Sequence, residues 1–95
     1  MKGIKFIAGT SHPELAKKIA KELRLPLTPV TIKKFLNGEI YVRIGENVRG
    51  MDVFLIQSTC TPVNNNLMEL LIMIDALKRA SADRIIAVMP YYGYA

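Results

Sequence analysis

The amino-acid sequence predicts an α/β fold, in which a mainly parallel sheet is flanked by helices and accompanied by one antiparallel hairpin. The first observation is a strand, a tight turn and an amphipathic helix within residues 4–23. The second is the segment 52–89, where two apolar strand-like runs enclose a long apolar helix, as in a parallel crossover. The third is the pair Asn37-Gly38 between two β-prone runs, which indicates a tight turn. A β-hairpin arm is therefore expected around residues 30–44.

The chain opens with a short β-prone run, Ile4–Ala8, which Gly9 closes. Ser11 and Glu14 are three residues apart, as in a capping box at the start of a helix. The apolar residues that follow recur at helical spacing, while lysines occupy the other face. These apolar residues are Leu15, Ala16, Ile19, Ala20 and Leu23. The pattern predicts a strand, a tight turn and an amphipathic helix.

The hairpin has two interpretations. A two-residue turn at Asn37-Gly38 places Phe35 opposite Ile40. This register gives both faces apolar side chains, which are Phe35, Ile40 and Val42 on one face and Val30 and Ile32 with Tyr41 on the other. A single core serves such a hairpin poorly. Either the loop is longer than two residues, or the hairpin is an arm contacted on two sides, which would make it a functional site.

The second half of the chain contains the strongest strand signal. Residues 52–57 contain an unbroken apolar run, 53–56, that is typical of a strand covered on both faces. Asn66 and Glu69 match an N-cap and an acidic third position, and they predict a helix from residue 67 to about residue 80. This helix is apolar nearly all round, so we expect it to lie between layers or in a subunit contact. Residues 84–89 form a second buried-type strand.

Composition limits the class of protein. The 95 residues are enough for one domain, and 13 Lys and Arg against 8 Asp and Glu give a net charge of +5. A basic domain suits phosphate-bearing small molecules or nucleic acid, but the sequence lacks long basic runs and an RNA-recognition aromatic pattern, so nucleic acid binding is not expected. Cys60 is the only cysteine and has no nearby base, so it is interpreted as inert in a reducing compartment. Without a signal segment or a membrane-length apolar run, we expect a cytoplasmic protein with no membrane contact.

Several polar residues are candidates for chemistry, and each also has a structural interpretation. Residues 9–12 lie where a strand meets a helix, a natural anion site, but the spacing of known phosphate loops is absent and helix capping is preferred. His12 is the only histidine, so a cluster of several histidines for a metal cannot form, and no Ser-His-Asp triad is assigned. Ser58 and Thr59 suit either phosphate binding or satisfaction of the loop backbone. Asp75, inside the apolar helix, is expected to bond between helices or subunits.

The hairpin turn carries the most specific combination. Phe35, Asn37 and Glu39 place an aromatic ring, an amide and a carboxylate close together. Such a set could stack on a nucleobase and bind its donor edge, and the alternative is an ordinary hairpin. Paired carboxylates for acid–base catalysis are absent from the pattern, as are cysteine and histidine spacings for metals. No catalytic residue and no metal ligand is therefore assigned.

Several segments together resemble one family. They are residues 35–39, 46–50, 56–60, 66–77, 80–82 and 90–95, and they follow in order along the whole chain. The sequence is similar to the N-terminal part of ribose-phosphate pyrophosphokinase. The resemblance implies a phosphoribosyltransferase-like α/β fold, with residues 1–95 forming an incomplete N-terminal domain. It also implies Mg²⁺-dependent transfer of the diphosphoryl group of ATP to ribose 5-phosphate, and homo-oligomers from dimers to hexamers.

The resemblance also implies roles for the hairpin residues. The positions matching Phe35, Asn37, Gly38 and Glu39 bind ATP in the site of a neighbouring subunit, with the ring against adenine and the polar groups near its amino edge. Asn37 stands where many family members have Asp, so the amide removes a charge. A basic segment directly after the position of Ala95 supplies further ATP contacts in the family.

A second ligand is implied by Arg49 and Ser81, which match positions of a regulatory phosphate site, although Asn47 stands where some members have Ser. The catalytic loop, the metal-binding histidine and the loop for the sugar phosphate have no counterpart in these residues. The Mg²⁺ ligands are therefore expected outside this chain, and the chain alone is expected to be inactive. The alternatives are a non-catalytic relative that regulates synthetase subunits and a basic nucleic-acid-binding domain.

Overall fold

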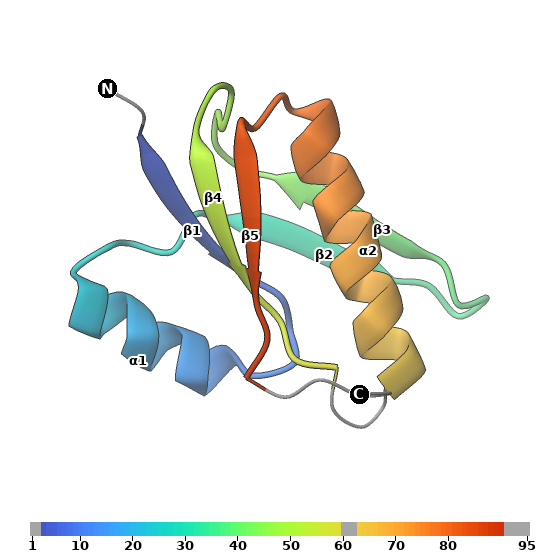
Figure 1. Cartoon of the computed structure of the whole chain (residues 1–95). Coiled ribbons are helices and arrows are strands. Elements are labelled where there is room, and N and C mark those ends of the chain that lie inside the picture. The colour runs from blue at the N-terminus through green and yellow to red at the C-terminus, as the bar shows by residue number, and fades with distance from the viewer. Residues whose placement is uncertain (1–2, 60–62, 91–95) are drawn as a thin grey trace.

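The computed structural model of the chain describes residues 3–59 and 63–90. Seven elements follow one another in the order expected for an α/β fold (Figure 1). They are β1 (Ile4–Ala8), α1 (Pro13–Leu23), β2 (Val30–Lys34), β3 (Ile40–Ile44), β4 (Asp52–Ile56), α2 (Val63–Arg79) and β5 (Arg84–Val88). Cys60 and the aromatic segment 91–95 lie outside the described residues.

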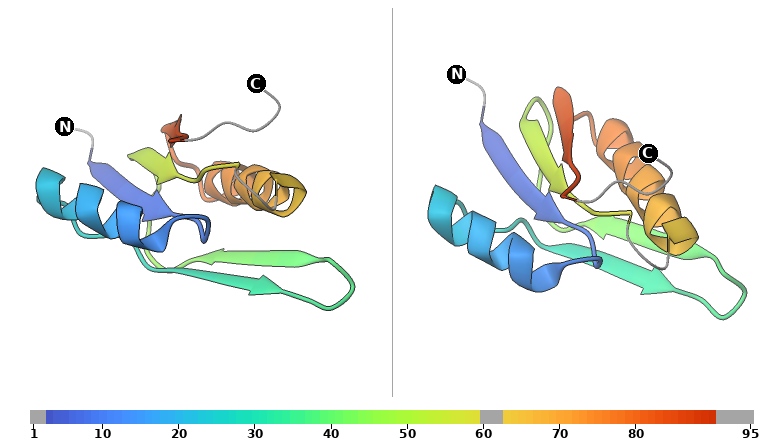
Figure 2. Two further views of the ribbon diagram at one scale, coloured as in Figure 1. Left: turned by 90° about the horizontal axis from the view of Figure 1, so that it is seen from below. Right: turned by 60° about the horizontal axis from the view of Figure 1, so that its bottom comes forward.

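A parallel sheet organises the domain. Its strand order is β1-β4-β5, and both pairings are parallel. The segment from β4 through α2 to β5 is the predicted parallel crossover. The hairpin β2-β3 is antiparallel and forms a separate two-stranded sheet, which runs alongside α2 in both views of Figure 2. The predicted α/β fold with a mainly parallel sheet and a hairpin arm is confirmed.

Each face of the parallel sheet has its own core, because successive side chains of a strand point to opposite faces. Ile7 and Leu55 contribute to the core beneath α2 and the hairpin, whereas Phe6 and Ile56 contribute to the core beneath α1. From the helices, Leu70, Met73 and Leu77 of α2 complete the first core, and Ala16 and Ala20 of α1 complete the second. The unbroken apolar run of β4 is thus explained by burial on both faces.

The hairpin loop contains three residues, so the predicted two-residue register is wrong by one. The N–H of Phe35 donates to the carbonyl of Glu39 at 2.8 Å, and the N–H of Gly38 donates to the carbonyl of Phe35 at 3.0 Å. Gly38 takes a left-handed conformation with φ of +89°, as expected for this three-residue loop. Lys34 therefore pairs with Ile40.

This register gives the hairpin one apolar face, because a slip of one residue moves every side chain of a strand to the other face. The residues of that face are Val30, Ile32, Ile40, Val42 and Ile44; all five are partly buried, and four of them pack against the core beneath α2. The opposite face is exposed and carries Thr31, Lys33, Tyr41 and Arg43. Of the two interpretations of the hairpin, the longer loop is confirmed, and the expectation of apolar side chains on both faces is wrong.

The predicted capping box of α1 is also wrong. The helix begins at Pro13, and His12 occupies the N-cap position without a side-chain capping bond. The Ser11 hydroxyl instead accepts a hydrogen bond from the N–H of Ser58 at 2.8 Å. Ser11 therefore joins the ends of β1 and β4 rather than satisfying the helix.

Helix α2 begins earlier than expected, at Val63. Asn66 and Glu69 are consequently both inside the helix. Contrary to what the local pattern predicts, Asn66 is not the N-cap, and Glu69 is not the third helical residue. Asp75 does not connect helices; its carboxylate accepts from Arg79 one turn further along the same helix, with 2.8 Å between Arg79 Nε and Asp75 Oδ2. This hydrogen bond and the charge of Asp75 raise the pKa of Arg79 above its usual value.

Helix α2 and the edge strand β5 both expose apolar side chains. Met68 and Leu71 of α2 are each 50% exposed, and Ile86 on the edge strand β5 is 37% exposed. Both a helix surface and a sheet edge are therefore open to solvent. Helix α2 is partly sandwiched, with one side against the sheet and hairpin and another side open. Neither described helix has the length and apolar character needed to cross a membrane.

Candidate functional site

The tip of the hairpin presents the four residues implied in ATP binding to solvent. Phe35 is 50% exposed, and Asn37, Gly38 and Glu39 are exposed as well. The loop bonds bring Phe35 and Glu39 directly opposite one another. The side-chain oxygen of Asn37 accepts from the N–H of Glu39 at 3.1 Å. This bond occupies an oxygen lone pair of Asn37 and leaves its amide N–H groups available for donation.

A cleft of about 450 Å³ separates the tip from α2. It is lined on the arm by Asn37, Gly38, Glu39 and Ile40, and on α2 by Met68 and Ile72. Three of the four predicted residues thus line one cleft, whereas the Phe35 ring lies outside it. The polar groups of the cleft come from the tip and its apolar groups come mainly from the helix.

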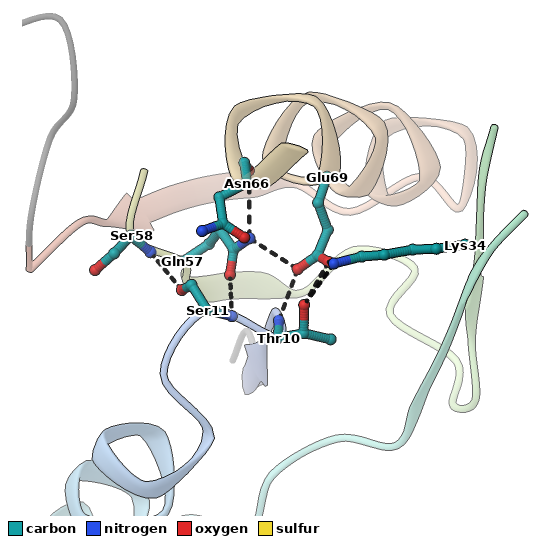
Figure 3. Close-up of polar contacts among 7 residues, drawn as sticks. All are labelled: Thr10, Ser11, Lys34, Gln57, Ser58, Asn66 and Glu69. Carbon is teal, nitrogen blue, oxygen red and sulfur yellow. Dashed lines mark hydrogen bonds and ion pairs between the residues drawn. The ribbon is translucent and has the colours of Figure 1, made fainter. Parts of the chain in front are cut away.

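A network of buried polar groups lies at the carboxyl ends of β1 and β4, centred on Glu69 (Figure 3). The side chain of Glu69 is fully buried. Its Oε2 accepts from the Thr10 N–H at 2.6 Å and from the Gln57 amide at 2.8 Å, and its Oε1 accepts from the Thr10 hydroxyl at 2.6 Å. These bonds replace the water that a buried carboxylate loses.

Lys34 connects this network to the arm. Its ammonium lies 3.2 Å from Glu69 Oε1 and donates to the Thr10 hydroxyl at 3.2 Å, while its own side chain is 45% exposed. Lys34 is the last residue of β2 and directly precedes Phe35. Figure 3 shows its side chain extending from the hairpin to the carboxylate of α2. A charge on the arm is therefore paired with a buried charge of the opposite sign.

The loop after β1 is satisfied internally, so it does not present its amides to an anion in this structure. The Thr10 N–H is bonded to Glu69, and the Ser11 N–H donates to Gln57 Oε1 at 3.1 Å. A Cβ atom at Gly9 would lie 2.2 Å from that oxygen and 2.6 Å from Glu69 Oε2. The structural interpretation of residues 9–12 is supported, although through Gln57 and Glu69 rather than through a helix cap.

The residues after β4 are not accessible in the described structure. Ser58 and Thr59 have no exposed surface, and the Ser58 N–H donates to the Ser11 hydroxyl. They therefore contribute to the buried end of the sheet. Cys60, which follows them, lies outside the described residues.

Arg49 and Ser81 lie in two adjoining loops at the opposite, amino end of the sheet. The N–H of Gly50 donates to the carbonyl of Ser81 at 2.9 Å, which joins the loop before β4 to the loop before β5. The side chain of Asn47 accepts from the Arg49 N–H at 3.0 Å and closes the first loop. Both Arg49 and Ser81 are exposed. The two residues implied in phosphate binding thus lie in loops that are bonded to each other, at the other end of β4 from the network around Glu69.

Sequence reasoning missed Gln57, Glu69 and Lys34 as members of one cluster. A signal for Glu69 exists, since it lies four and eight residues before Met73 and Leu77, on the most buried line of α2. A carboxylate at that spacing predicts a buried partner. The partner, Lys34, is far from Glu69 in the sequence, so it could not be identified before the fold was known.

No metal site is present among residues 3–59 and 63–90, where no three His, Cys, Asp or Glu side chains lie close enough together to hold an ion. At the arm tip Glu39 is a single carboxylate, and Glu69 is already bonded to Thr10, Gln57 and Lys34. The residues described do not fit a Mg²⁺ site.

The fold and the arm define an α/β domain with a parallel sheet and an antiparallel hairpin next to its second helix. Residues 4–95 match the family model of the N-terminal domain of ribose phosphate pyrophosphokinase. This match covers nearly the whole chain, and the chain belongs to that family.

Similar proteins share this assignment. The ribose-phosphate pyrophosphokinase of Clostridium perfringens is 67% identical over 94 residues, which are 99% of this chain and 30% of that protein. The Haemophilus influenzae protein of the same name is 60% identical over 95 residues, 30% of its length. A crystal structure of phosphoribosylpyrophosphate synthetase from Mycobacterium smegmatis superposes with a TM-score of 0.94 at 55% identity, covering 98% of this chain and 31% of that one. The chain thus spans about 30% of the length of these relatives.

Proposed function

We propose that this sequence serves as the N-terminal segment of a ribose-phosphate diphosphokinase, which transfers the diphosphoryl group of ATP to ribose 5-phosphate. The observation that carries the proposal is the similarity over the whole chain to proteins named ribose-phosphate pyrophosphokinase. The exposed arm tip, with its ring, amide and carboxylate, agrees with a role in nucleotide binding. The reacting groups are assigned to parts of such an enzyme beyond these residues, as are the Mg²⁺ ligands.

The arm tip has a specific chemistry for adenine. Phe35 offers a half-exposed ring on which a base can stack, an interaction worth about 1–3 kcal/mol. The Glu39 carboxylate is an acceptor for the exocyclic amino group. The Asn37 oxygen is engaged with the Glu39 N–H, so the Asn37 amide donates to a ring nitrogen. Gly38 permits the left-handed turn that sets these groups side by side.

The assembly and location follow the same proposal. The arm tip completes the ATP site of a neighbouring subunit, in a homo-oligomer from dimer to hexamer, in the cytoplasm. The exposed apolar residues Met68, which lines the cleft beside the tip, and Leu71 of the same helix support a subunit contact there. Arg49 and Ser81 contribute to a regulatory phosphate site, supported by their proximity at the amino end of the sheet.

Substitution of Phe35 by Ala tests the proposal in a full-length family enzyme that carries this sequence as its first 95 residues. Loss of base stacking is expected to raise KM for ATP about tenfold or more and to leave KM for ribose 5-phosphate unchanged. Steady-state kinetics with each substrate varied in turn measure both constants.

The matched control for Phe35→Ala is Tyr41→Ala, which removes an exposed aromatic ring from the same hairpin but outside the tip. It is expected to change neither constant by more than about twofold, since surface substitutions are usually close to neutral. Equal losses for both substrates in Phe35→Ala would show that the arm is only scaffolding.

A further inference from the structure

We infer that Lys34 is a positioning residue for the arm, acting through its ion pair with the buried Glu69. The inference rests on the proposed function of the tip, which it deepens by naming the contact that orients the tip. Lys34 Nζ lies 3.2 Å from Glu69 Oε1, and Lys34 immediately precedes Phe35. The contact therefore fixes the backbone directly before Phe35 to the polar network at the carboxyl ends of β1 and β4.

The buried end of the pair is held by several hydrogen bonds. Glu69 has no exposed side-chain surface, and its two oxygens are held by the Thr10 N–H, the Thr10 hydroxyl and the Gln57 amide. Gly9 allows this close approach, because a Cβ there would collide with Gln57 and Glu69. A carboxylate fixed from several sides offers Lys34 a single, defined anchor point.

The other end of the pair, Lys34, belongs to the arm and directly precedes its exposed tip. The apolar face of the hairpin fastens β2 and β3 to the core, but Phe35 is half exposed and Leu36 is fully exposed. Lys34 lies between the packed part of the hairpin and its exposed tip, and it forms the last β2-β3 pair with Ile40. Its ammonium bonds outside the hairpin, to Glu69 and to the Thr10 hydroxyl. Releasing this contact frees the tip without removing apolar packing from the core.

The choice of lysine at this position also matches a positioning role. The side chain is 45% exposed, so its removal opens no cavity, and its stem lies along the surface while its head reaches the buried carboxylate. The next residue back, Lys33, has the same charge but lies on the exposed face of the hairpin. The two lysines therefore separate the effect of a specific contact from the effect of positive charge near a nucleotide.

The test uses a full-length family enzyme that carries this sequence as its first 95 residues. Lys34→Met is expected to raise KM for ATP about fivefold, the scale of one charge-assisted hydrogen bond with a partly exposed donor, while kcat and KM for ribose 5-phosphate stay within twofold. Lys34→Arg, which keeps the charge and the reach to Glu69, is expected to restore most of the ATP affinity. Lys33→Met is expected to behave like the unmodified enzyme.

A second variant addresses the other end of the pair. Glu69→Gln is expected to raise KM for ATP to a similar extent, and the double variant with Lys34→Met to be no worse than either single variant, since both break one contact. If Glu69→Gln fails to fold, KM for ATP of Lys34→Met and Lys34→Arg tests the positioning role without it. Unchanged KM for ATP in Lys34→Met, an equal effect of Lys33→Met, or parallel loss for both substrates would each overturn the inference.

Phe35→Ala, measured in parallel, separates this inference from the proposed function. If Phe35→Ala weakens ATP binding and Lys34→Met does not, the tip binds ATP but Lys34 does not position it. If Phe35→Ala has no effect on ATP, the proposed role of the tip fails, and the positioning role of Lys34 is overturned with it.

Discussion

Gly9 occupies the most confined position among the glycines of the described chain. It lies at the end of β1, under the side chains of Gln57 and Glu69, and an added Cβ would stand 2.2 Å from Gln57 Oε1. These two side chains are themselves fixed by hydrogen bonds to Thr10 and Ser11, so neither can move aside without breaking a buried bond. Glycine is required here because there is no room for a Cβ atom, and not because of the backbone conformation.

Gly9→Ala is therefore expected to destabilise the domain by about 2 kcal/mol, the usual cost of overpacking a site that cannot yield. Urea denaturation of the 95-residue chain at low concentration measures this change. Gly50→Ala is the control, because Gly50 has a φ of +72° and no atom within 4 Å of an added Cβ. Its cost is limited to left-handed strain of about 1 kcal/mol. A smaller loss for Gly9→Ala than for Gly50→Ala would contradict the crowded site.

Glu69 shows why part of the site could not be predicted from local pattern. Asn66 and Glu69 satisfy the rule for a helix start, but α2 begins at Val63 and the carboxylate is used elsewhere. A capping rule considers only neighbours in sequence, whereas burial against β1 and β4 decides the role of this side chain. The tip residues Phe35, Asn37 and Glu39 could be proposed as a candidate set from the sequence alone, because they lie within five consecutive residues of one hairpin turn.

At the scale of elements, the hairpin combines a correct prediction with an error. The arm expected around residues 30–44 is present, because β2 begins at Val30 and β3 ends at Ile44. The loop length does not follow from the sequence, because an Asn-Gly pair suits a two-residue turn and also ends a three-residue loop with glycine in the left-handed position. Packing on the core beneath α2 selects the second arrangement, since only that register gathers Ile32 and Val42 on one face.

A double-mutant cycle tests this register. Ile32 and Val42 are cross-strand partners, so Ile32→Ala and Val42→Ala are expected to show a coupling free energy of about 0.5 kcal/mol in urea denaturation. Ile32→Ala and Tyr41→Ala form the control pair, which lies on opposite faces and should be additive within about 0.3 kcal/mol. Coupling in the control pair and additivity in the first would favour the two-residue turn.

At the scale of the whole molecule, the sheet separates two groups of candidate residues. The arm tip and the network around Glu69 lie beyond the carboxyl ends of β1 and β4, whereas Arg49 and Ser81 lie in loops that precede β4 and β5. Between them, α2 presents Met68 and Leu71 to solvent. Exposed apolar residues next to a binding arm are typical of a surface that another chain covers.

The 95-residue chain by itself is therefore expected to associate as its concentration rises, because Met68, Leu71 and the β5 edge are open. Light scattering across a concentration series measures the effect. Leu71→Lys is expected to reduce association, whereas Leu23→Lys, at a leucine of similar exposure on α1, should leave it unchanged. A single monomeric species at high concentration would contradict the expectation.

The three-residue loop has a consequence for how the arm can change during evolution. A two-residue turn of the favoured kind would require left-handed backbone at both central positions, whereas here Gly38 alone supplies it and Asn37 is not among the residues with positive φ. The backbone thus imposes no demand for asparagine at position 37. The residue there is free to alternate between amide and carboxylate, so the charge offered to a ligand can diverge between relatives while the shape of the arm is inherited unchanged.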